Sequence, residues 1–248
     1  MGINCSGLGP IEAHRCRGVV PLTAILCGLF LLAGCKSGPK SWDFSIKNPF
    51  KSSVAADGSK STKGGPEFAP QLTVGRNLER AGKHEEARGV YEKLIVAHPH
   101  RFEPYHRLGV VADRQKRYRE AQALYAQAIR REPRNADLFN DLGYSLFLQG
   151  KLEKAEVAML KAVALSPSDA RYRNNLGMVL AHMERYDEAL AEFRRAGSDA
   201  DAYYNLAFVL TAKDRAGDAT DCFRLALAAD PEHEPSRRAL ESSEGYNR

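Results

Sequence analysis

The sequence lacks the short motifs by which common enzyme classes are recognised. It contains no G-x-x-x-x-G-K-[ST] phosphate loop, no G-x-S-x-G nucleophile elbow and no H-E-x-x-H zinc motif. Its most closely spaced histidines, His98, His100 and His106, have no carboxylate or thiol partner at a spacing typical of metal sites. We therefore predict no catalytic residue, no metal site, no cofactor and no small-molecule substrate.

Cysteine is scarce beyond the first 35 residues. Cys5, Cys16, Cys27 and Cys35 precede residue 36, and only Cys222 follows it. No pair of cysteines is therefore available for a disulfide within residues 36–248. Cys222 falls in a predicted helix, where we expect a small packing residue rather than a reactive thiol.

A charge-free apolar run occupies residues 18–34, directly after Arg15 and Arg17. It is slightly shorter than the roughly 20 apolar residues of a transmembrane helix. A basic start, a short apolar run and small residues at its end are typical of a secretory signal peptide. An uncleaved membrane anchor, or a signal peptide cut elsewhere, is the alternative.

The run ends in Leu-Ala-Gly-Cys at residues 32–35, which resembles the lipobox of bacterial lipoproteins. The resemblance implies removal of residues 1–34 and attachment of acyl chains to Cys35. The mature protein would then be held on a membrane without spanning it, because two or more chains give stable anchoring. Lys36, in place of aspartate, favours the periplasmic face of the outer membrane by the sorting rule of didermal bacteria.

Residues 35–66 form a basic segment before the predicted folded part. This segment is rich in Ser, Gly, Lys and Pro, a linker composition that cannot bury a core, and we predict disorder. Six lysines and two aspartates give residues 36–66 a net charge of +4, and the leader adds +1. Residues 67–248 are therefore close to neutral, which argues against a nucleic-acid partner. The lysines either approach an anionic lipid surface or serve as a solvated spacer.

One stretch of this linker alternates apolar and polar residues. Trp42, Phe44 and Ile46 would share one side of an extended segment, and Trp42 is the only tryptophan of the chain. The stretch has three possible roles, which the sequence leaves open. It would lie at the lipid interface, dock back on the folded domain or add a strand to a partner.

The rest of the chain contains an internal repeat. A small residue recurs at intervals of 34 residues, shortened to 30 at the last step: Gly75, Gly109, Gly143, Gly177 and Ala207. Twelve residues after each comes alanine, at Ala87, Ala121, Ala155, Ala189 and Ala219. Four residues later comes a large apolar side chain, at Tyr91, Tyr125, Met159, Phe193 and Phe223. Proline closes most units, at Pro99, Pro133, Pro167 and Pro231.

This pattern resembles the tetratricopeptide repeat, whose 34-residue unit is a helix-turn-helix. The resemblance implies an all-α solenoid of five repeats over residues 67–233, since such hairpins bury their faces only by stacking. The small residues would let the two helices of a repeat approach closely, and the large side chain would fill the gap between units. Residues 234–248 are expected to form a capping helix and tail.

Local signals refine this expectation. Asn135, Asp169 and Asp199 precede three of the predicted first helices and are expected to be N-caps. The fourth repeat is four residues short, lacks its proline and has Arg173 where an aromatic is usual. We therefore expect altered geometry at the joint between repeats four and five.

In the tetratricopeptide repeat family, the first helix of each repeat lines a concave groove that holds peptides. The resemblance implies a groove lined by residues at matching positions: Arg76, Glu79, His106, Val110, Asp113, Asn140, Tyr144, Phe147, Asn174, Met178, Tyr204 and Phe208. Asn175 and Asn205 match the position that often hydrogen-bonds a peptide backbone. Aromatics beside amides suit recognition of a protein segment. For Phe147 and Phe208, the alternative to lining the groove is packing between the helices.

The anchor, the linker and the repeats together predict a lipid-anchored periplasmic scaffold that binds proteins and supports assembly of an envelope machine. Residues 136–193 are similar to the repeat lipoproteins of tight-adherence pilus assembly, which implies pilus or secretion components as partners. The alternative is a structural membrane tether, in which the basic linker binds and the repeats act as a spacer.

Overall fold

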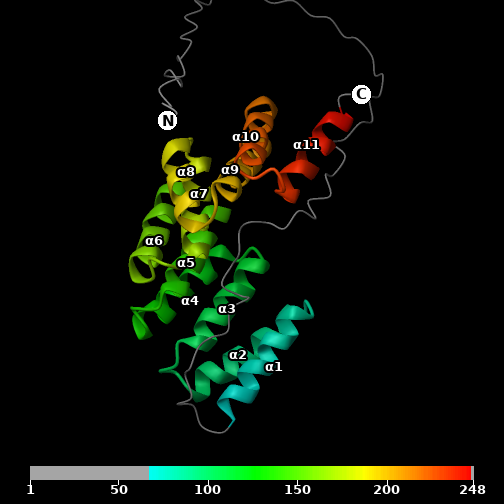
Figure 1. The fold of residues 1–248 in the computed structure, drawn as a ribbon. Helices are drawn as coiled ribbons and strands as arrows, with labels where there is room; N and C mark the ends of the chain where they lie inside the picture. The colour runs from blue at the N-terminus through cyan, green and yellow to red at the C-terminus, as the bar shows by residue number, and fades with distance from the viewer. Residues whose placement is uncertain (1–66, 247–248) are drawn as a thin grey trace, which may run out of the picture. The chain divides into compact units, whose positions relative to one another are not determined.

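The computed structural model describes residues 67–246, and the predicted leader, the lipidation site at Cys35 and the linker with its Trp42 stretch lie outside them. The described residues form eleven helices and no strand (Figure 1). Their bounds are α1 Phe68–Arg80, α2 His84–Ala97, α3 Glu103–Arg114, α4 Tyr118–Arg131, α5 Ala136–Leu148, α6 Leu152–Leu165, α7 Ala170–His182, α8 Tyr186–Ala196, α9 Asp199–Ala212, α10 Ala216–Ala229 and α11 Glu234–Tyr246.

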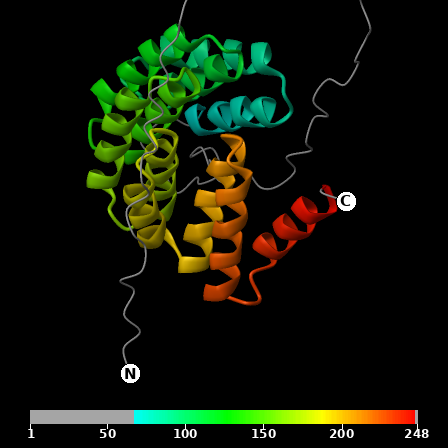
Figure 2. The ribbon, with the colours of Figure 1, turned by 90° about the horizontal axis from the view of Figure 1, so that it is seen from above.

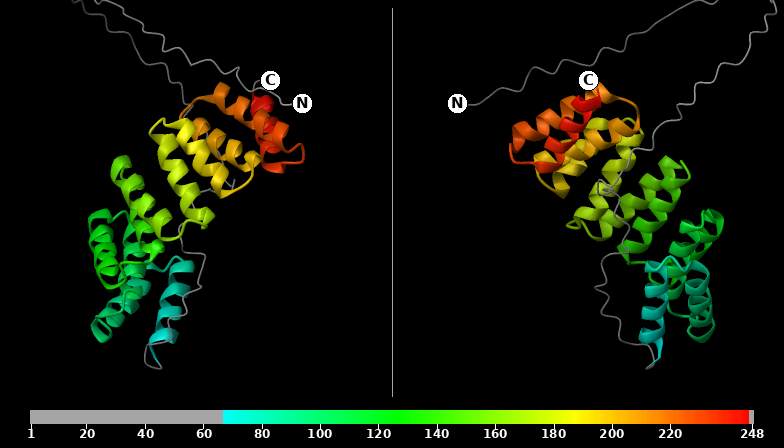
Figure 3. Two further views of the ribbon diagram at one scale, coloured as in Figure 1. Left: turned by 60° about the vertical axis from the view of Figure 1, so that its left-hand side comes forward. Right: turned by 90° about the vertical axis from the view of Figure 1, so that its right-hand side faces the viewer.

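The helices pair in chain order into five hairpins, followed by α11. Each odd-numbered helix from α1 to α9 packs against the helix that follows it, and each hairpin packs against the next. Figure 3 shows the hairpins stacked one after another from α1 to α10. The predicted all-α solenoid of five repeats with a terminal capping helix is therefore confirmed.

The two helices of a hairpin occupy different sides of the stack. We call α1, α3, α5, α7 and α9 the A helices, and α2, α4, α6, α8 and α10 the B helices. Successive A helices contact one another, whereas successive B helices of the described residues make no contact of similar extent. The A helices therefore lie on the inner side of the curve that the hairpins follow (Figure 2). We call the exposed side of these helices the A-helix face.

The small residue of each A helix is pressed against the large residue of its own hairpin. A Cβ atom added to Gly75 would clash with Cε1 of Tyr91, and one added to Gly177 would lie 2.6 Å from Cε1 of Phe193. Both aromatic side chains are fully buried. The prediction of close helix approach is confirmed. The large residue packs on the glycine within its own unit, and the expectation that it also fills the gap between units stays a prediction.

The N-caps explain where three A helices begin. The side chains of Asn135 and Asp169 accept hydrogen bonds from backbone amides two residues later, as predicted. The prediction of Asp199 as an N-cap is wrong, because α9 begins at that residue and Ser198 caps it. Ser198 and Asp201 form a reciprocal capping box, in which each side chain accepts a hydrogen bond from the other residue's backbone amide.

All five A helices end in the same turn, with one residue in the left-handed region. Glycine takes this place in the first and third hairpins, at Gly82 and Gly150. The other three hairpins use residues with a side chain, Lys116, Glu184 and Asp214, with φ between 58° and 64°. The amide of the left-handed residue and the next amide bond back to the helix, as in Gly82 to Glu79 and Lys83 to Leu78. These two bonds are those of a Schellman motif.

The fourth hairpin departs from the others less than its sequence suggests. Its B helix, α8, has 11 residues instead of 14, yet α8 packs on α9 as α6 packs on α7. Arg173 donates to the carbonyl of Pro167 at 2.8 Å, as the Tyr105 hydroxyl does to that of Pro99 at 3.2 Å. Arg173 therefore replaces the usual aromatic in its hydrogen bond to the preceding turn.

The core runs through the whole stack as two clusters of buried side chains. One extends from Phe68 to Leu138 and the other from Leu146 to Phe223. Leu142 of α5 packs against both, so the two clusters are continuous. At the end of the stack α11 packs on α10, and Ala239 and Leu240 lie against the second cluster. This contact covers the apolar side of the last hairpin.

Candidate functional site

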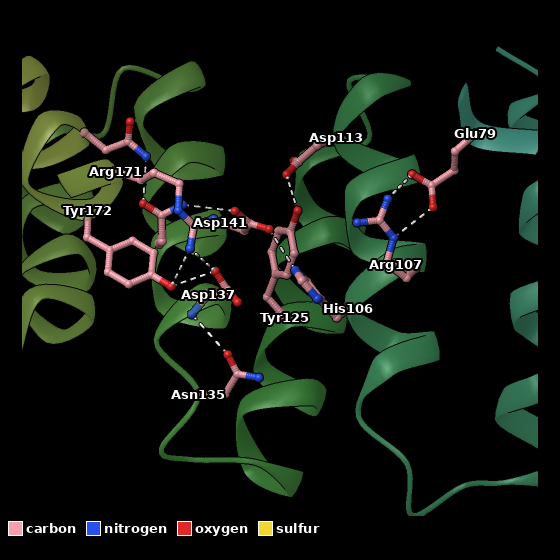
Figure 4. Close-up of polar contacts among 12 residues, drawn as sticks. Glu79, His106, Arg107, Asp113, Tyr125, Asn135, Asp137, Asp141, Arg171 and Tyr172 are labelled. Atoms are coloured by element: carbon pink, nitrogen blue, oxygen red, sulfur yellow. Dashed lines mark hydrogen bonds and ion pairs between the residues drawn. The ribbon is translucent and has the colours of Figure 1, made fainter. Parts of the chain in front are cut away.

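The A-helix face is the candidate site because the repeat brings equivalent residues of separate hairpins side by side. Residues 34 apart stand at the same place on successive A helices, and these helices contact one another. A row of side chains therefore crosses the face from one hairpin to the next (Figure 4).

Amide and carboxylate side chains form part of that row. Nε2 of His106 lies 2.7 Å from a carboxylate oxygen of Asp141, and Nδ2 of Asn140 donates to the other oxygen at 3.1 Å. Nδ2 of Asn175 donates to Oδ1 of Asn140 at 2.7 Å. Farther along, Nδ2 of Asn205 donates to Oδ1 of Asn174 at 3.3 Å. We call these six residues the amide ladder.

The amide ladder is mostly buried. Asn140 and Asn175 are completely buried, and Asp141 is nearly so. Because buried polar groups must be hydrogen-bonded, each of these side chains holds its neighbour from the adjacent helix in place. The ladder therefore fixes the register of α3, α5, α7 and α9 beneath the A-helix face.

Two helices that carry residues of the amide ladder, α5 and α9, also carry four aromatic side chains. Tyr144, Phe147, Tyr204 and Phe208 are half-buried and pack against the second core cluster, and we call them the aromatic row. Phe147 meets His182 of α7 edge-on, with ring centroids 4.8 Å apart. Phe147 and Phe208 therefore both pack against the helices and stay partly exposed.

One member of the aromatic row, Tyr144, lies beside acidic groups. Burial raises the pKa of the Tyr144 hydroxyl, and the neighbouring carboxylates of Asp113 and Asp141 raise it further. Burial also raises the pKa of Tyr204. Both tyrosines are therefore neutral donors at physiological pH.

Asp113 is the most unusual carboxylate of the face. It accepts a hydrogen bond from the Tyr125 hydroxyl at 2.8 Å (Figure 4). It accepts another from the Ser145 hydroxyl at 2.7 Å. Burial and the charge of Asp141 raise its pKa and the two hydroxyl donors lower it, and the net result is a pKa raised to about 6. Its two donors are neutral hydroxyls, so they leave its negative charge uncompensated.

The first two hairpins present a different surface. Glu79 of α1 is buried and pairs with Arg107 of α3, with Nε 3.0 Å from Oε1, and it also accepts from the Tyr91 hydroxyl at 2.5 Å. Glu79 and Val110, both expected to line the groove, are therefore inside the fold. Arg76 is half-buried on the same face of α1.

The structure separates the predicted binding residues into two groups. Asn140, Asn175, Asn205 and Met178 are buried, and Met178 belongs to the core cluster. A second group is partly exposed on the A helices: Arg76, His106, Asn174, Tyr144, Tyr204 and Phe208. The binding role of both groups stays a prediction.

Asp141 and Ser145 belong to the site although the sequence reasoning did not name them. Asp141 stands 34 residues after Arg107 and 34 before Asn175, at the repeat position where Asn175 was recognised. The 34-residue period was therefore sufficient to identify Asp141 as a site residue. Ser145 is marked only by its contact with Asp113 across the hairpin boundary, which the sequence does not reveal.

No helix of residues 67–246 has the length and hydropathy needed to cross a membrane. No group of three or more metal-ligating side chains occurs among the same residues.

Family models described as tetratricopeptide repeat match residues 71–100, 106–170, 157–199 and 200–233, which together exceed half of the chain. A search of curated proteins found no match. Among solved structures, YrrB, a TPR protein with an unusual peptide-binding site, is 27% identical, with 69% of this chain and 91% of YrrB covered and a TM-score of 0.51.

Two further solved structures share the fold. MamA from Desulfovibrio magneticus RS-1, from residue 41 to its end, is 18% identical, with coverages of 68% and 98% and a TM-score of 0.56. The Pseudomonas aeruginosa pilF protein is 20% identical, with coverages of 71% and 88% and a TM-score of 0.56. At these identities the likeness concerns the arrangement of the helices alone.

Proposed function

The chain belongs to the tetratricopeptide repeat family, and on that premise we propose that it is a lipid-anchored scaffold that binds an extended segment of a protein partner on its A-helix face. The proposed role is non-catalytic. It consists of holding one component of an envelope machine close to a membrane.

The observation that carries this proposal is the aromatic row above the amide ladder. The buried ladder holds α5, α7 and α9 in register, so Tyr144, Tyr204 and Phe208 are presented by a rigid surface. Rigid aromatic side chains bury area at a small entropic cost, which makes them effective anchors for a partner. The likeness to YrrB supports a peptide as the ligand, because that protein is described by its peptide-binding site.

The proposal of a membrane anchor comes from residues outside the described part. Leu-Ala-Gly-Cys at residues 32–35 supports lipidation of Cys35, and Lys36 supports the periplasmic face of the outer membrane. Envelope proteins, including pilus or secretion components, are therefore the proposed partners. A Cys35→Ser variant tests the anchor, because it should lose metabolic labelling with a fatty acid and move out of the membrane fraction.

The binding face is tested by crosslinking and affinity capture in cells that produce the lipidated protein. Tyr144→Ala/Tyr204→Ala should lose the proteins captured by the wild type. Tyr203→Ala is the matched control, since Tyr203 neighbours Tyr204 but contacts Arg194, with ring and guanidinium 5.3 Å apart. If the double variant and the wild type capture the same proteins, the A-helix face is not the binding surface.

The same experiment separates the scaffold from a tether whose linker binds. A chain that lacks residues 37–66 but keeps Cys35 retains the described helices. A scaffold keeps its partners in this variant, whereas a tether loses them.

A further inference from the structure

The A-helix face of the middle hairpins combines an apolar surface with negative charge. The aromatic row supplies the apolar part, and Leu148, at the end of α5, adds a side chain that leaves 42% of the residue exposed. Four aspartates lie on α3, α5 and α9: Asp113, Asp137, Asp141 and Asp201. Asp141 lies against His106, and Asp201 lies against His233. All four arginines of α3, α5, α7 and α9 lie against carboxylates. Arg107 and Arg114 lie against Glu79. Arg171 lies between Asp137 and Asp169, and Arg173 pairs with Glu192.

The charge of Asp113 makes this surface selective. Its hydrogen-bond donors are the hydroxyls of Tyr125 and Ser145, and the nearby charge of Asp141 repels it. A positive group beside Asp113 would therefore gain from both carboxylates in a partly desolvated place. The complementary ligand is an extended segment with apolar residues and lysine or arginine between them.

The chain itself contains such a segment outside the described residues. Residues 44–51 read Phe-Ser-Ile-Lys-Asn-Pro-Phe-Lys, which gives three large apolar side chains, two lysines and no acidic residue. Pro49 limits the backbone conformations that its neighbours sample, which lowers the entropic cost of holding the segment extended.

The length of the intervening chain suits an intramolecular contact. Residues 52–66 separate the segment from the described helices. Fifteen residues span about 20 Å as a coil and roughly 50 Å when extended. Packed helices are about 8–10 Å apart, so along the A-helix face α5 lies on the order of 20 Å from α1 and α9 on the order of 40 Å, which is within the extended length.

We propose that residues 44–51 dock on the aromatic row of their own chain, with a lysine beside Asp113. A short linker gives the segment an effective concentration in the millimolar range, so a weak contact suffices for occupancy. A partner that uses the same face then has to displace the segment. While the segment is docked, the chain between Cys35 and the folded domain consists of residues 36–43, and displacement would lengthen it to residues 36–66. Only this consequence of partner binding rests on the proposed function.

The proposal is tested by photo-crosslinking within the full chain. A photoreactive benzoylphenylalanine in place of Phe50 should crosslink intramolecularly to peptides of α5, α7 or α9, identified by mass spectrometry. The same group in place of Val54 is the matched control and should crosslink to these helices far less. Tyr144→Ala/Phe208→Ala should abolish the Phe50 product. Crosslinks to B helices, to a second molecule or to lipid, or no product, would overturn the proposal.

A second measurement does not depend on changing the folded part. Phe44→Ser/Ile46→Ser/Phe50→Ser in the full chain should speed hydrogen exchange in α5 and α9 by about tenfold, if the effective concentration is about ten times the dissociation constant. Val54→Ser should leave exchange unchanged. Equal exchange in wild type and triple variant contradicts docking. The loss of captured partners in Tyr144→Ala/Tyr204→Ala would still support the proposed function, so the two ideas fail separately.

Discussion

Glu79 of the first hairpin and Arg107 of the second form an ion pair in which both side chains are almost completely buried. The pair joins α1 to α3, and Tyr91 of α2 donates its hydroxyl to the same carboxylate. Burial and the charge of Glu79 raise the pKa of the Tyr91 phenol, while Arg107 lowers it. The first two hairpins are therefore locked by polar contacts inside the stack.

Breaking this pair should be costly. Arg107→Met leaves a buried carboxylate without its cation, and the expected loss of unfolding free energy is about 3–5 kcal/mol. Glu79→Leu/Arg107→Met should lose less than the sum of the single changes, because neither charge is stranded. Urea unfolding of the two single variants and the double variant measures the coupling. Arg224→Ala, at an exposed pair with Asp221, is the control and should change stability by less than about 1 kcal/mol.

The close packing between A and B helices predicts opposite effects for two glycine substitutions. Gly109→Ala places a Cβ 2.9 Å from the buried ring of Tyr125, so we expect a loss of about 1–3 kcal/mol. Gly89→Ala, inside α2 with no atom within 4 Å of the added carbon, should gain about 0.5–1 kcal/mol from helix propensity. Denaturation midpoints of both variants check the prediction. Equal effects at the two sites would contradict the packing.

The left-handed turn residues offer a stabilising change. Lys116 and Glu184 hold φ of 60° and 64°, which costs a residue with a side chain about 1–2 kcal/mol. Glycine avoids this cost but loses more backbone entropy, so Lys116→Gly and Glu184→Gly should each gain on the order of 0.5–1 kcal/mol. The reverse change, Gly150→Ala at φ 70°, should destabilise by a similar amount. Thermal melting of the three variants tests whether glycine raises and alanine lowers the stability at these positions of positive φ.

Asp113 should give the stability of the protein a specific pH dependence. Its folded pKa of about 6 lies above the ordinary value of 3.8, so the folded protein binds the proton more tightly than the unfolded chain. This group therefore favours folding below about pH 4, and that contribution is lost as the pH rises through 6.

Asp113→Asn removes this titration. The free energy of unfolding of the variant minus that of the wild type should be lower at pH 4.5 than at pH 7. Urea unfolding of both proteins at both pH values measures this difference. Glu132→Gln, at an exposed residue, measures the background effect of replacing one surface carboxylate. If the difference in unfolding free energy between Asp113→Asn and the wild type is equal at the two pH values, Asp113 has the same pKa in the folded and the unfolded protein.

The 34-residue period predicted most of the fold because packing constraints repeat with it. The spacing of four glycines predicted the hairpins, at Gly75, Gly109, Gly143 and Gly177. Each glycine lies against a large residue 16 positions later. The caps at Asn135 and Asp169 were predictable because a capping residue acts on its own next turn. The cap of α9 was misassigned because the fourth repeat is shortened, which changes where the next helix begins, and the residue before Asp199, Ser198, forms the cap.

The candidate site was predictable in position but less so in exposure. The period placed Asn140, Asn175 and Asn205 on the A helices, and they are there. Whether such a residue faces solvent depends on how closely the next helix approaches, which the spacing does not encode. Met178 and Glu79 are buried for this reason, whereas Tyr144 and Phe208 remain partly exposed.

The sequence by itself determined the number of hairpins, their order and their turns, since these follow from local propensity and a repeated apolar pattern. Only the tertiary structure decided which polar residues meet. Arg107 reaches Glu79 28 residues earlier, His106 reaches Asp141 35 residues later, and Ser145 reaches Asp113 across a hairpin boundary. These contacts depend on the angle and distance between stacked helices, which arise from the packing of the whole core and from no single segment.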